Sequence, residues 1–96
     1  MSQLIWTPAA TQDVARLHAF LYEKNRQAAQ KAISAIQAGV RILEQHPSIG
    51  RPVQAMDTEF REWFIDFGGS GYVVLYRTDE SLTTLLAIRH QKEAGY

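Results

Sequence analysis

Two apolar runs in the last third of the chain strongly constrain its fold. The first covers residues 71–77 and the second covers residues 82–89, and both are rich in valine, leucine, isoleucine and tyrosine or threonine. Such residues favour β-strands. Asp79 and Glu80 would form a two-residue turn between the runs, so together they predict an antiparallel hairpin. Its strands end in the cations Arg77 and Arg89.

A helical hairpin is predicted ahead of these strands. Residues 3–6 form a short apolar segment typical of a strand, and Thr7 and Pro8 then supply an N-cap and a first-turn proline. Apolar residues recur at helical spacing over about residues 8–24 and again over about residues 27–45. The sequence therefore predicts two amphipathic helices in succession.

Small side chains in the second helix indicate a close contact. Ala32, Ala35 and Gly39 follow one another at spacings of three and four residues. A glycine inside a helix costs up to about 1 kcal/mol relative to alanine. We therefore expect Gly39 to be there for packing, and the first helix to approach the second closely at this stripe.

A third strand completes the predicted sheet. Residues 61–67 read as a strand, and the glycine-rich segment 68–71 would connect it to the next one. The predicted order is β-α-α-β-β-β, an α+β fold in which a helical hairpin covers one face of a small antiparallel sheet. A chain of 96 residues has room for one such domain, spanning residues 1–96. The other face of the sheet would be left for a functional contact.

Composition excludes several classes of function. Ten basic and ten acidic residues give no net charge, and the part of the chain after Ser48 carries five basic against seven acidic residues. Proteins that hold nucleic acid mainly through phosphates are usually basic, so a protein partner is the better expectation. The chain has no cysteine and no apolar run of the ~18 residues that a membrane span needs. We expect a cytoplasmic protein without a membrane contact.

Several short motifs, in their order and spacing, resemble the RelE/ParE superfamily of type II toxin–antitoxin toxins. They are Asp13-Val14, Tyr22, residues 47–52, Phe60-Arg61-Glu62, residues 71–77 and Ile88-Arg89-His90. The resemblance covers nearly the whole chain. It implies a bacterial toxin that inhibits growth and is neutralised by a cognate antitoxin, with operator DNA bound only through the toxin–antitoxin complex.

One residue separates the two main branches of that superfamily. Members that cleave mRNA on the ribosome typically place an arginine after the tyrosine that corresponds to Tyr72, whereas this chain has Val73. Valine can neither activate a 2′-hydroxyl, nor neutralise a phosphate, nor protonate a leaving group. The valine-rich strand and the ending Ile88-Arg89-His90 look more similar to the ParE branch, which binds DNA gyrase.

The predicted strand register gives a second argument against a nuclease. If Asp79 and Glu80 form the turn, Thr78 faces Ser81 and Arg77 faces Leu82. Arg89 would then lie roughly 23 Å from Arg77 along the strand, too far to share one phosphate. This register places Arg89 on an outer face and assigns the alternate residues to the core. The outer set is Tyr72, Val74, Tyr76 and Arg89, and the core set is Val73, Leu75, Leu86 and Ile88.

The candidate contact residues each have an ordinary structural alternative. Arg61 could instead pair with a neighbouring carboxylate, Arg51 could simply shape its loop, and the tyrosines could be half-buried sheet residues. His90 could titrate near neutral pH, but we predict no catalytic residue. The three histidines are widely separated and suggest no metal site, and no motif implies a cofactor. The candidates for contact with a target or antitoxin are Arg61, Tyr72, Tyr76, Arg77, Arg89, His90 and Tyr96.

We therefore expect the toxin of a plasmid-stabilisation type of toxin–antitoxin system that inhibits DNA gyrase by binding. One alternative is a ribosome-dependent endoribonuclease. Another is an inactive toxin that only binds its antitoxin and helps to repress its operon.

Overall fold

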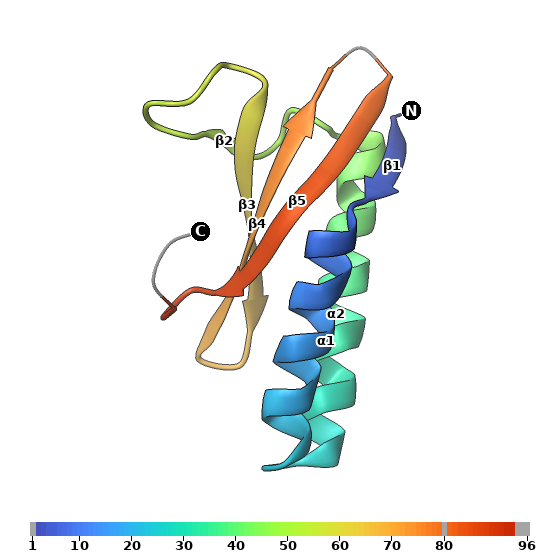
Figure 1. Ribbon diagram of the computed structural model, residues 1–96, viewed down its shortest axis with the longest axis vertical. Coiled ribbons are helices and arrows are strands. Elements are labelled where there is room, and N and C mark those ends of the chain that lie inside the picture. The colour runs from blue at the N-terminus through green and yellow to red at the C-terminus, as the bar shows by residue number, and fades with distance from the viewer. Residues whose placement is uncertain (1, 80, 94–96) are drawn as a thin grey trace.

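Two helices cover one face of a five-stranded sheet in residues 2–79 and 81–93, the part of the chain that the computed structural model describes (Figure 1). The strand order is β1-β5-β4-β3-β2. In chain order the elements are β1 (Gln3–Trp6), α1 (Pro8–Tyr22), α2 (Arg26–Gln45), β2 (Arg51–Pro52), β3 (Phe60–Phe67), β4 (Ser70–Thr78) and β5 (Leu82–His90).

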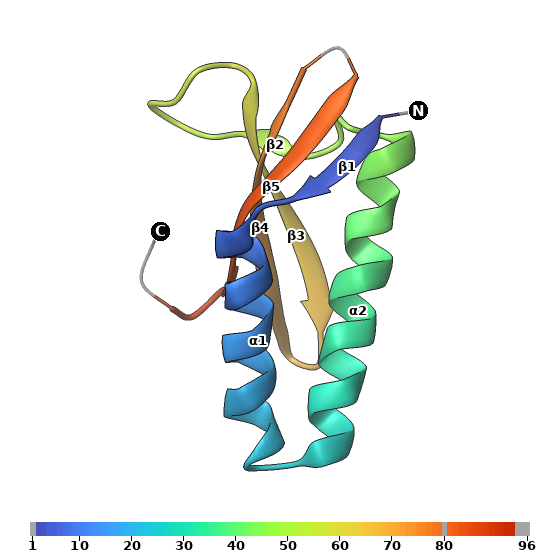
Figure 2. The same ribbon diagram turned by 45° about the vertical axis from the view of Figure 1, so that its right-hand side comes forward.

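The predicted α+β class is confirmed, with two changes to the sheet. The short strand β2 was not predicted, and it pairs with β3 through Arg51–Glu62 and Pro52–Arg61. The sheet is mixed and not wholly antiparallel, because β1 runs parallel to β5 at its edge (Figure 2). A parallel neighbour follows from the helical hairpin, which carries the chain back to the same end of the sheet.

Both helices begin at side-chain caps. Thr7 Oγ1 accepts a hydrogen bond from the Ala10 N–H at 3.1 Å and donates one to the Leu85 carbonyl at 2.7 Å. Asn25 Oδ1 accepts from the Ala28 N–H at 3.1 Å, so the residue that interrupts the helical pattern starts the second helix. Across the residues that the structure describes, no helix is both long and apolar enough to cross a membrane.

Gly39 packs against the sheet and not, as expected, against α1. A Cβ atom at this position would lie 2.7 Å from side-chain atoms of Ile65 on β3. The Gly39 carbonyl also accepts a hydrogen bond from the indole Nε1 of Trp63 at 3.0 Å. The expected close contact therefore exists, but it joins α2 to β3.

The predicted register of β4 and β5 is wrong. Thr78 pairs with Thr83 and not with Ser81, while Arg77 pairs with Thr84 and not with Leu82. Tyr76 pairs with Leu85 and Leu75 with Ala87, so Leu86 forms a β-bulge. The longer connection and the bulge together shift the end of β5 by an odd number of residues. An odd shift exchanges the two faces of a strand.

The core therefore contains the residues that were expected to face outward. Tyr72 and Tyr76 are 2% and 0% exposed, and with Val74 and Ile88 they pack against the helices. Val73 and Leu75 point to the opposite face, together with Arg89. The assignment of Tyr72, Val74 and Tyr76 to an outer surface is thus wrong, whereas Ile88 belongs to the core as expected. Val73 and Leu75 are also buried, at 7% exposed, but they lie on the face away from the helices.

Candidate functional site

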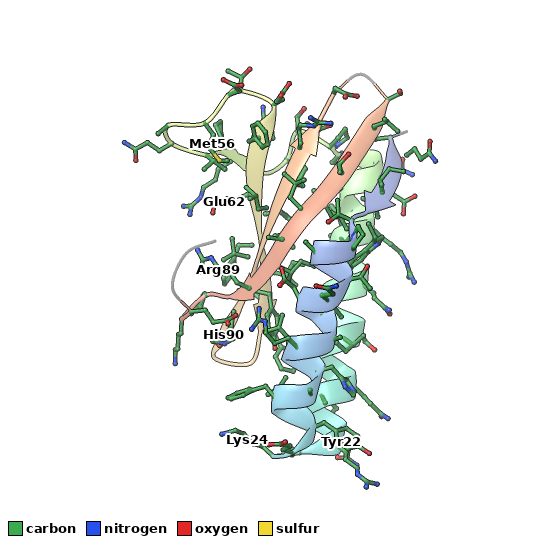
Figure 3. All side chains as sticks on the ribbon, viewed as in Figure 1. Tyr22, Lys24, Met56, Glu62, Arg89 and His90 are labelled. Atoms are coloured by element: carbon green, nitrogen blue, oxygen red, sulfur yellow. The ribbon has the colours of Figure 1, made fainter. Side chains whose placement is uncertain are left out.

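The face of the sheet opposite the helices is the open face. Its centre is apolar, because Phe64, Val73 and Leu75 lie there on neighbouring strands. Charged side chains surround this centre, and Figure 3 shows Glu62 and Arg89 on the side of the sheet away from the helices. In register, the open face includes Phe60, Glu62, Phe64, Asp66, Val73, Leu75, Arg77, Ala87 and Arg89.

Arg89 is directed toward the backbone at the end of β5. Its Nη1 atom donates to the carbonyl oxygens of His90 at 3.4 Å, Gln91 at 3.3 Å and Glu93 at 3.3 Å. These contacts curl the segment after β5 around the guanidinium group. Arg89 thus holds residues 90–93 in place, in addition to whatever it offers a partner.

His90 lies on the helix-covered side and is held from two directions. Its Nε2 atom is 2.8 Å from Ser70 Oγ, and its Nδ1 atom accepts from the Lys92 N–H at 3.1 Å. The ring meets that of Tyr72 edge-on, with centroids 5.5 Å apart. An accepting Nδ1 places the imidazole proton on Nε2, which then donates to Ser70.

Glu93 ties the end of β5 to α1. Its Oε1 atom accepts from the His90 N–H at 2.7 Å, and Oε2 forms an ion pair with Arg16 at 2.6 Å. Burial acts to raise the pKa of Glu93, but the His90 N–H, the Arg16 hydrogen bond and the positive charges nearby outweigh it. The net effect lowers the pKa from its ordinary value of 4.5.

The two central tyrosines of β4 are kept in the phenol form. Burial raises the pKa of Tyr72, and the negative charge of Glu93 adds to this effect. Burial also raises the pKa of Tyr76, against the smaller opposing effects of the Gly50 N–H and the Arg61 charge. Neither group therefore ionises near neutral pH.

Arg61 and Tyr76 both contact the loop between α2 and β2. Arg61 Nη1 donates to the Gly50 carbonyl at 2.6 Å and the Ser48 carbonyl at 3.2 Å. The Tyr76 hydroxyl donates to the Pro47 carbonyl at 2.7 Å. Arg61 binds this backbone and not the Glu62 or Asp66 carboxylate that the sequence offered as its alternative partner.

Arg77 is exposed on the open face and closer to Arg89 than expected. Arg89 pairs with Val73, which is four residues from Arg77 along β4. At about 3.3 Å per residue the two arginines are roughly 13 Å apart along the sheet, not 23 Å. The geometric objection to a shared phosphate is therefore weakened. Tyr96, the remaining candidate, lies outside the described residues.

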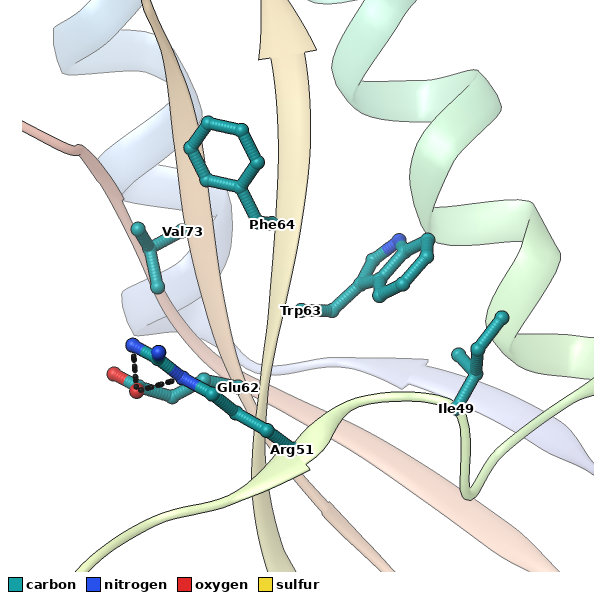
Figure 4. A pocket seen from close by; sticks show the side chains of 6 residues that line it. All are labelled: Ile49, Arg51, Glu62, Trp63, Phe64 and Val73. Carbon is teal, nitrogen blue, oxygen red and sulfur yellow. Dashed lines mark hydrogen bonds and ion pairs between the residues drawn. The ribbon is translucent and has the colours of Figure 1, made fainter.

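A shallow pocket of about 310 Å³ opens beside the edge of β3 (Figure 4). Arg51 reaches across it and binds Glu62, with Nη2 and Nε lying 3.2 and 3.3 Å from Oε1. Ile49 and Phe64 are among the exposed large apolar residues. The lining residues are Ile49, Arg51, Glu62, Trp63, Phe64 and Val73.

The sequence did not single out Ile49, Phe64 or Trp63 as site residues. Phe64 lies in the run Trp63-Phe64-Ile65, where neighbours on both faces are apolar and alternation is hidden. The one usable signal was Ile49 itself, an isoleucine in a loop between two prolines.

This arrangement suits binding better than acid–base chemistry. The open face presents carboxylates and arginines around an apolar centre, whereas His90, Tyr72 and Tyr76 lie on the covered side. RNA cleavage needs a base, a cation and an acid near one phosphate. Within residues 2–79 and 81–93, no three His, Asp or Glu side chains gather where they could hold a metal ion.

Comparison with known proteins identifies the class of this fold. Residues 4–95 match the profile of the family described as the ParE toxin of the type II toxin–antitoxin system parDE. The chain is 33% identical over 86 residues to Toxin RelE3 of Caulobacter vibrioides, covering 90% of each protein. A chain from the chromosomal ParDE toxin–antitoxin system of P. aeruginosa has the same fold, with a TM-score of 0.77 at 20% identity. That match covers 94% of this chain and 96% of the other.

The protein is therefore a small α+β toxin of the RelE/ParE superfamily. It belongs to the ParE toxin family of type II toxin–antitoxin systems.

Proposed function

We propose that this toxin inhibits DNA gyrase by binding to it, and that a cognate antitoxin neutralises it. Membership of the ParE toxin family supports the antitoxin partner and favours gyrase as the target. The observation that carries the proposal is the apolar centre of the open face, where Phe64 is 44% exposed and pairs with Val73. Val73 is only 7% exposed and lies opposite Arg89 in the β4–β5 pairing, where it supplies no group for catalysis. An apolar centre with charged surroundings is typical of a protein-binding surface.

A ribosome-dependent endoribonuclease is the second candidate. Arg77 and Arg89 share the open face at a spacing of roughly 13 Å, and Glu62 lies on the same face. The relative from Caulobacter vibrioides also carries the name RelE3. Against this candidate, Arg51 occupies the Glu62 carboxylate, and the phenols of β4 are buried.

A supercoiling assay with purified gyrase separates the two candidates. We expect the folded toxin to inhibit supercoiling, and a molar excess of antitoxin to reverse the inhibition. The matched arm adds the same toxin to translating ribosomes and maps mRNA cleavage by primer extension. Cleaved mRNA together with unaffected gyrase would replace the first candidate by the second, and inactivity in both arms would favour a toxin that only binds its antitoxin.

A further inference from the structure

Two side chains from the sheet fix the loop that precedes β2. The Tyr76 hydroxyl donates to the Pro47 carbonyl at 2.7 Å and accepts from the Gly50 N–H at 3.0 Å. Arg61 Nη1 donates to the carbonyls of Gly50 and Ser48 at 2.6 and 3.2 Å. Four hydrogen bonds thus hold a segment of four residues.

The loop packs so closely against β3 and β4 at Gly50 that no side chain fits there. A Cβ atom there would lie 2.6 Å from both the Glu62 carbonyl oxygen and the Tyr76 hydroxyl oxygen. Gly50 is itself buried, and so is Tyr76. A buried hydroxyl that serves backbone groups of one loop strongly restricts the conformations of that loop.

The fixed loop exposes Ile49 and Arg51 to solvent. Ile49, between Ser48 and Gly50, is 46% exposed, and the Arg51 side chain is 78% exposed. Both line the pocket beside the partly exposed Phe64 (Figure 4). Ile49 is exposed although buried hydrogen bonds fix its loop, and core packing does not account for this. Preformed apolar anchors next to a cation are typical of binding sites.

We propose that residues 47–51 form a preorganised contact for the cognate antitoxin, and that Tyr76 and Arg61 are its positioning residues. This inference rests on the proposed antitoxin partner and does not depend on gyrase as the target. The antitoxin segment inserts an apolar side chain between Ile49 and Phe64. It places a carboxylate next to Arg51, whose side chain stays 78% exposed beside its ion pair with Glu62. A rigid loop binds more tightly than a mobile one because less conformational entropy is lost.

Tyr76→Phe tests the positioning role because it removes only the hydroxyl. We expect faster hydrogen exchange at the Gly50 amide and roughly three- to tenfold weaker antitoxin binding, the order expected for losing one or two hydrogen bonds. Tyr72→Phe is the matched control, since Tyr72 lies on the same face of β4 but does not contact the loop. It should leave both readouts unchanged. Equal binding by Tyr76→Phe and wild type would overturn the proposal.

A double-mutant cycle distinguishes positioning from a general loss of stability. Ile49→Ala should weaken antitoxin binding without changing exchange at Gly50. If Tyr76 acts through Ile49, adding Tyr76→Phe to Ile49→Ala should weaken binding less than it does in the wild type. Arg61→Gln should loosen the same loop through a different residue, because it removes the hydrogen bonds to Gly50 and Ser48. Unchanged binding by Ile49→Ala alone would also overturn the proposal, whatever Tyr76→Phe does.

Antitoxin binding by the wild-type toxin tests the proposed partner separately from the proposed loop contact. If wild type fails to bind the antitoxin, the proposed partner is wrong. If wild type binds and the loop variants bind equally well, only the loop contact is wrong.

Discussion

Arg89 lies directly across the β4–β5 ladder from Val73. In this position the arginine shares the open face with an apolar strand, while its guanidinium group reaches the carbonyl oxygens of residues 90, 91 and 93. Arg89 thus joins the apolar centre of the sheet to the backbone of residues 90–93.

Arg89→Ala should loosen the segment after β5. The variant loses hydrogen bonds to three carbonyls, so we expect faster amide exchange in residues 91–93 and a loss of about 1 kcal/mol in the free energy of unfolding. Arg77→Ala is the matched control, because Arg77 is exposed on the same face. It should change stability by less than about 0.5 kcal/mol. Identical amide exchange of residues 91–93 in the two variants would show that Arg89 does not hold this segment.

The helices were predicted well, whereas the faces of the central strand were not. Caps at Thr7 and a helical apolar period leave clear local signals, so α1 and α2 lie where they were expected. Residues 72–76 are apolar or aromatic at every position and show no alternation. Their faces depend on the connection after Thr78 and on the bulge at Leu86, which no local pattern indicates.

The candidate site was predicted in part for the same reason. Arg89 was correctly assigned to the outer face, where it is partly exposed, and Arg51 was recognised as a possible loop contact. Arg77 is exposed, although the predicted register put it on the same face as Val73 and Leu75. The pocket was missed because it depends on tertiary contacts, chiefly those that hold Ile49 beside Phe64. Tyr72 and Tyr76 were taken for surface anchors because the register was wrong.

Glu93→Gln should reduce stability at neutral pH but not in acid. The folded-state pKa of Glu93 is lowered from 4.5, so its ionised form stabilises the fold above that value. This contribution disappears as the pH falls through the folded-state pKa. Because the Glu93 side chain is 37% exposed, we expect a difference below about 1 kcal/mol. Urea unfolding of wild type and variant should differ at neutral pH and converge well below pH 4.5. A difference that persists in acid would argue against the ion pair.

Gly39→Ala should destabilise the toxin despite the better helix propensity of alanine. The added methyl group would meet Ile65 at 2.7 Å, and overpacking of this kind costs about 1–3 kcal/mol. The helix gains at most about 1 kcal/mol from the same change. Thermal unfolding measures the net effect. Combining Gly39→Ala with Ile65→Val should recover part of the loss, and a fully additive pair would show that the clash lies elsewhere.

Phe64→Ala should weaken binding of the protein partners with little effect on folding. Phe64 is 44% exposed at the apolar centre of the open face, so removing its ring deletes contact area that a partner can use. Ile42→Ala is the matched control, because Ile42 is similarly exposed but lies on α2. We expect about tenfold or greater loss of antitoxin affinity for Phe64→Ala alone. Equal losses in both variants would remove the open face from the interface.

Trapping of cleaved DNA by gyrase tests most directly whether the toxin acts by binding this enzyme. Purified toxin is incubated with gyrase and supercoiled plasmid, and linear DNA is scored after protein digestion, with Phe64→Ala and excess antitoxin as parallel arms. We expect linear DNA with wild-type toxin, much less with Phe64→Ala, and none when antitoxin is present. Intact plasmid at a large excess of folded wild-type toxin, alongside cleaved mRNA on translating ribosomes, would contradict this expectation.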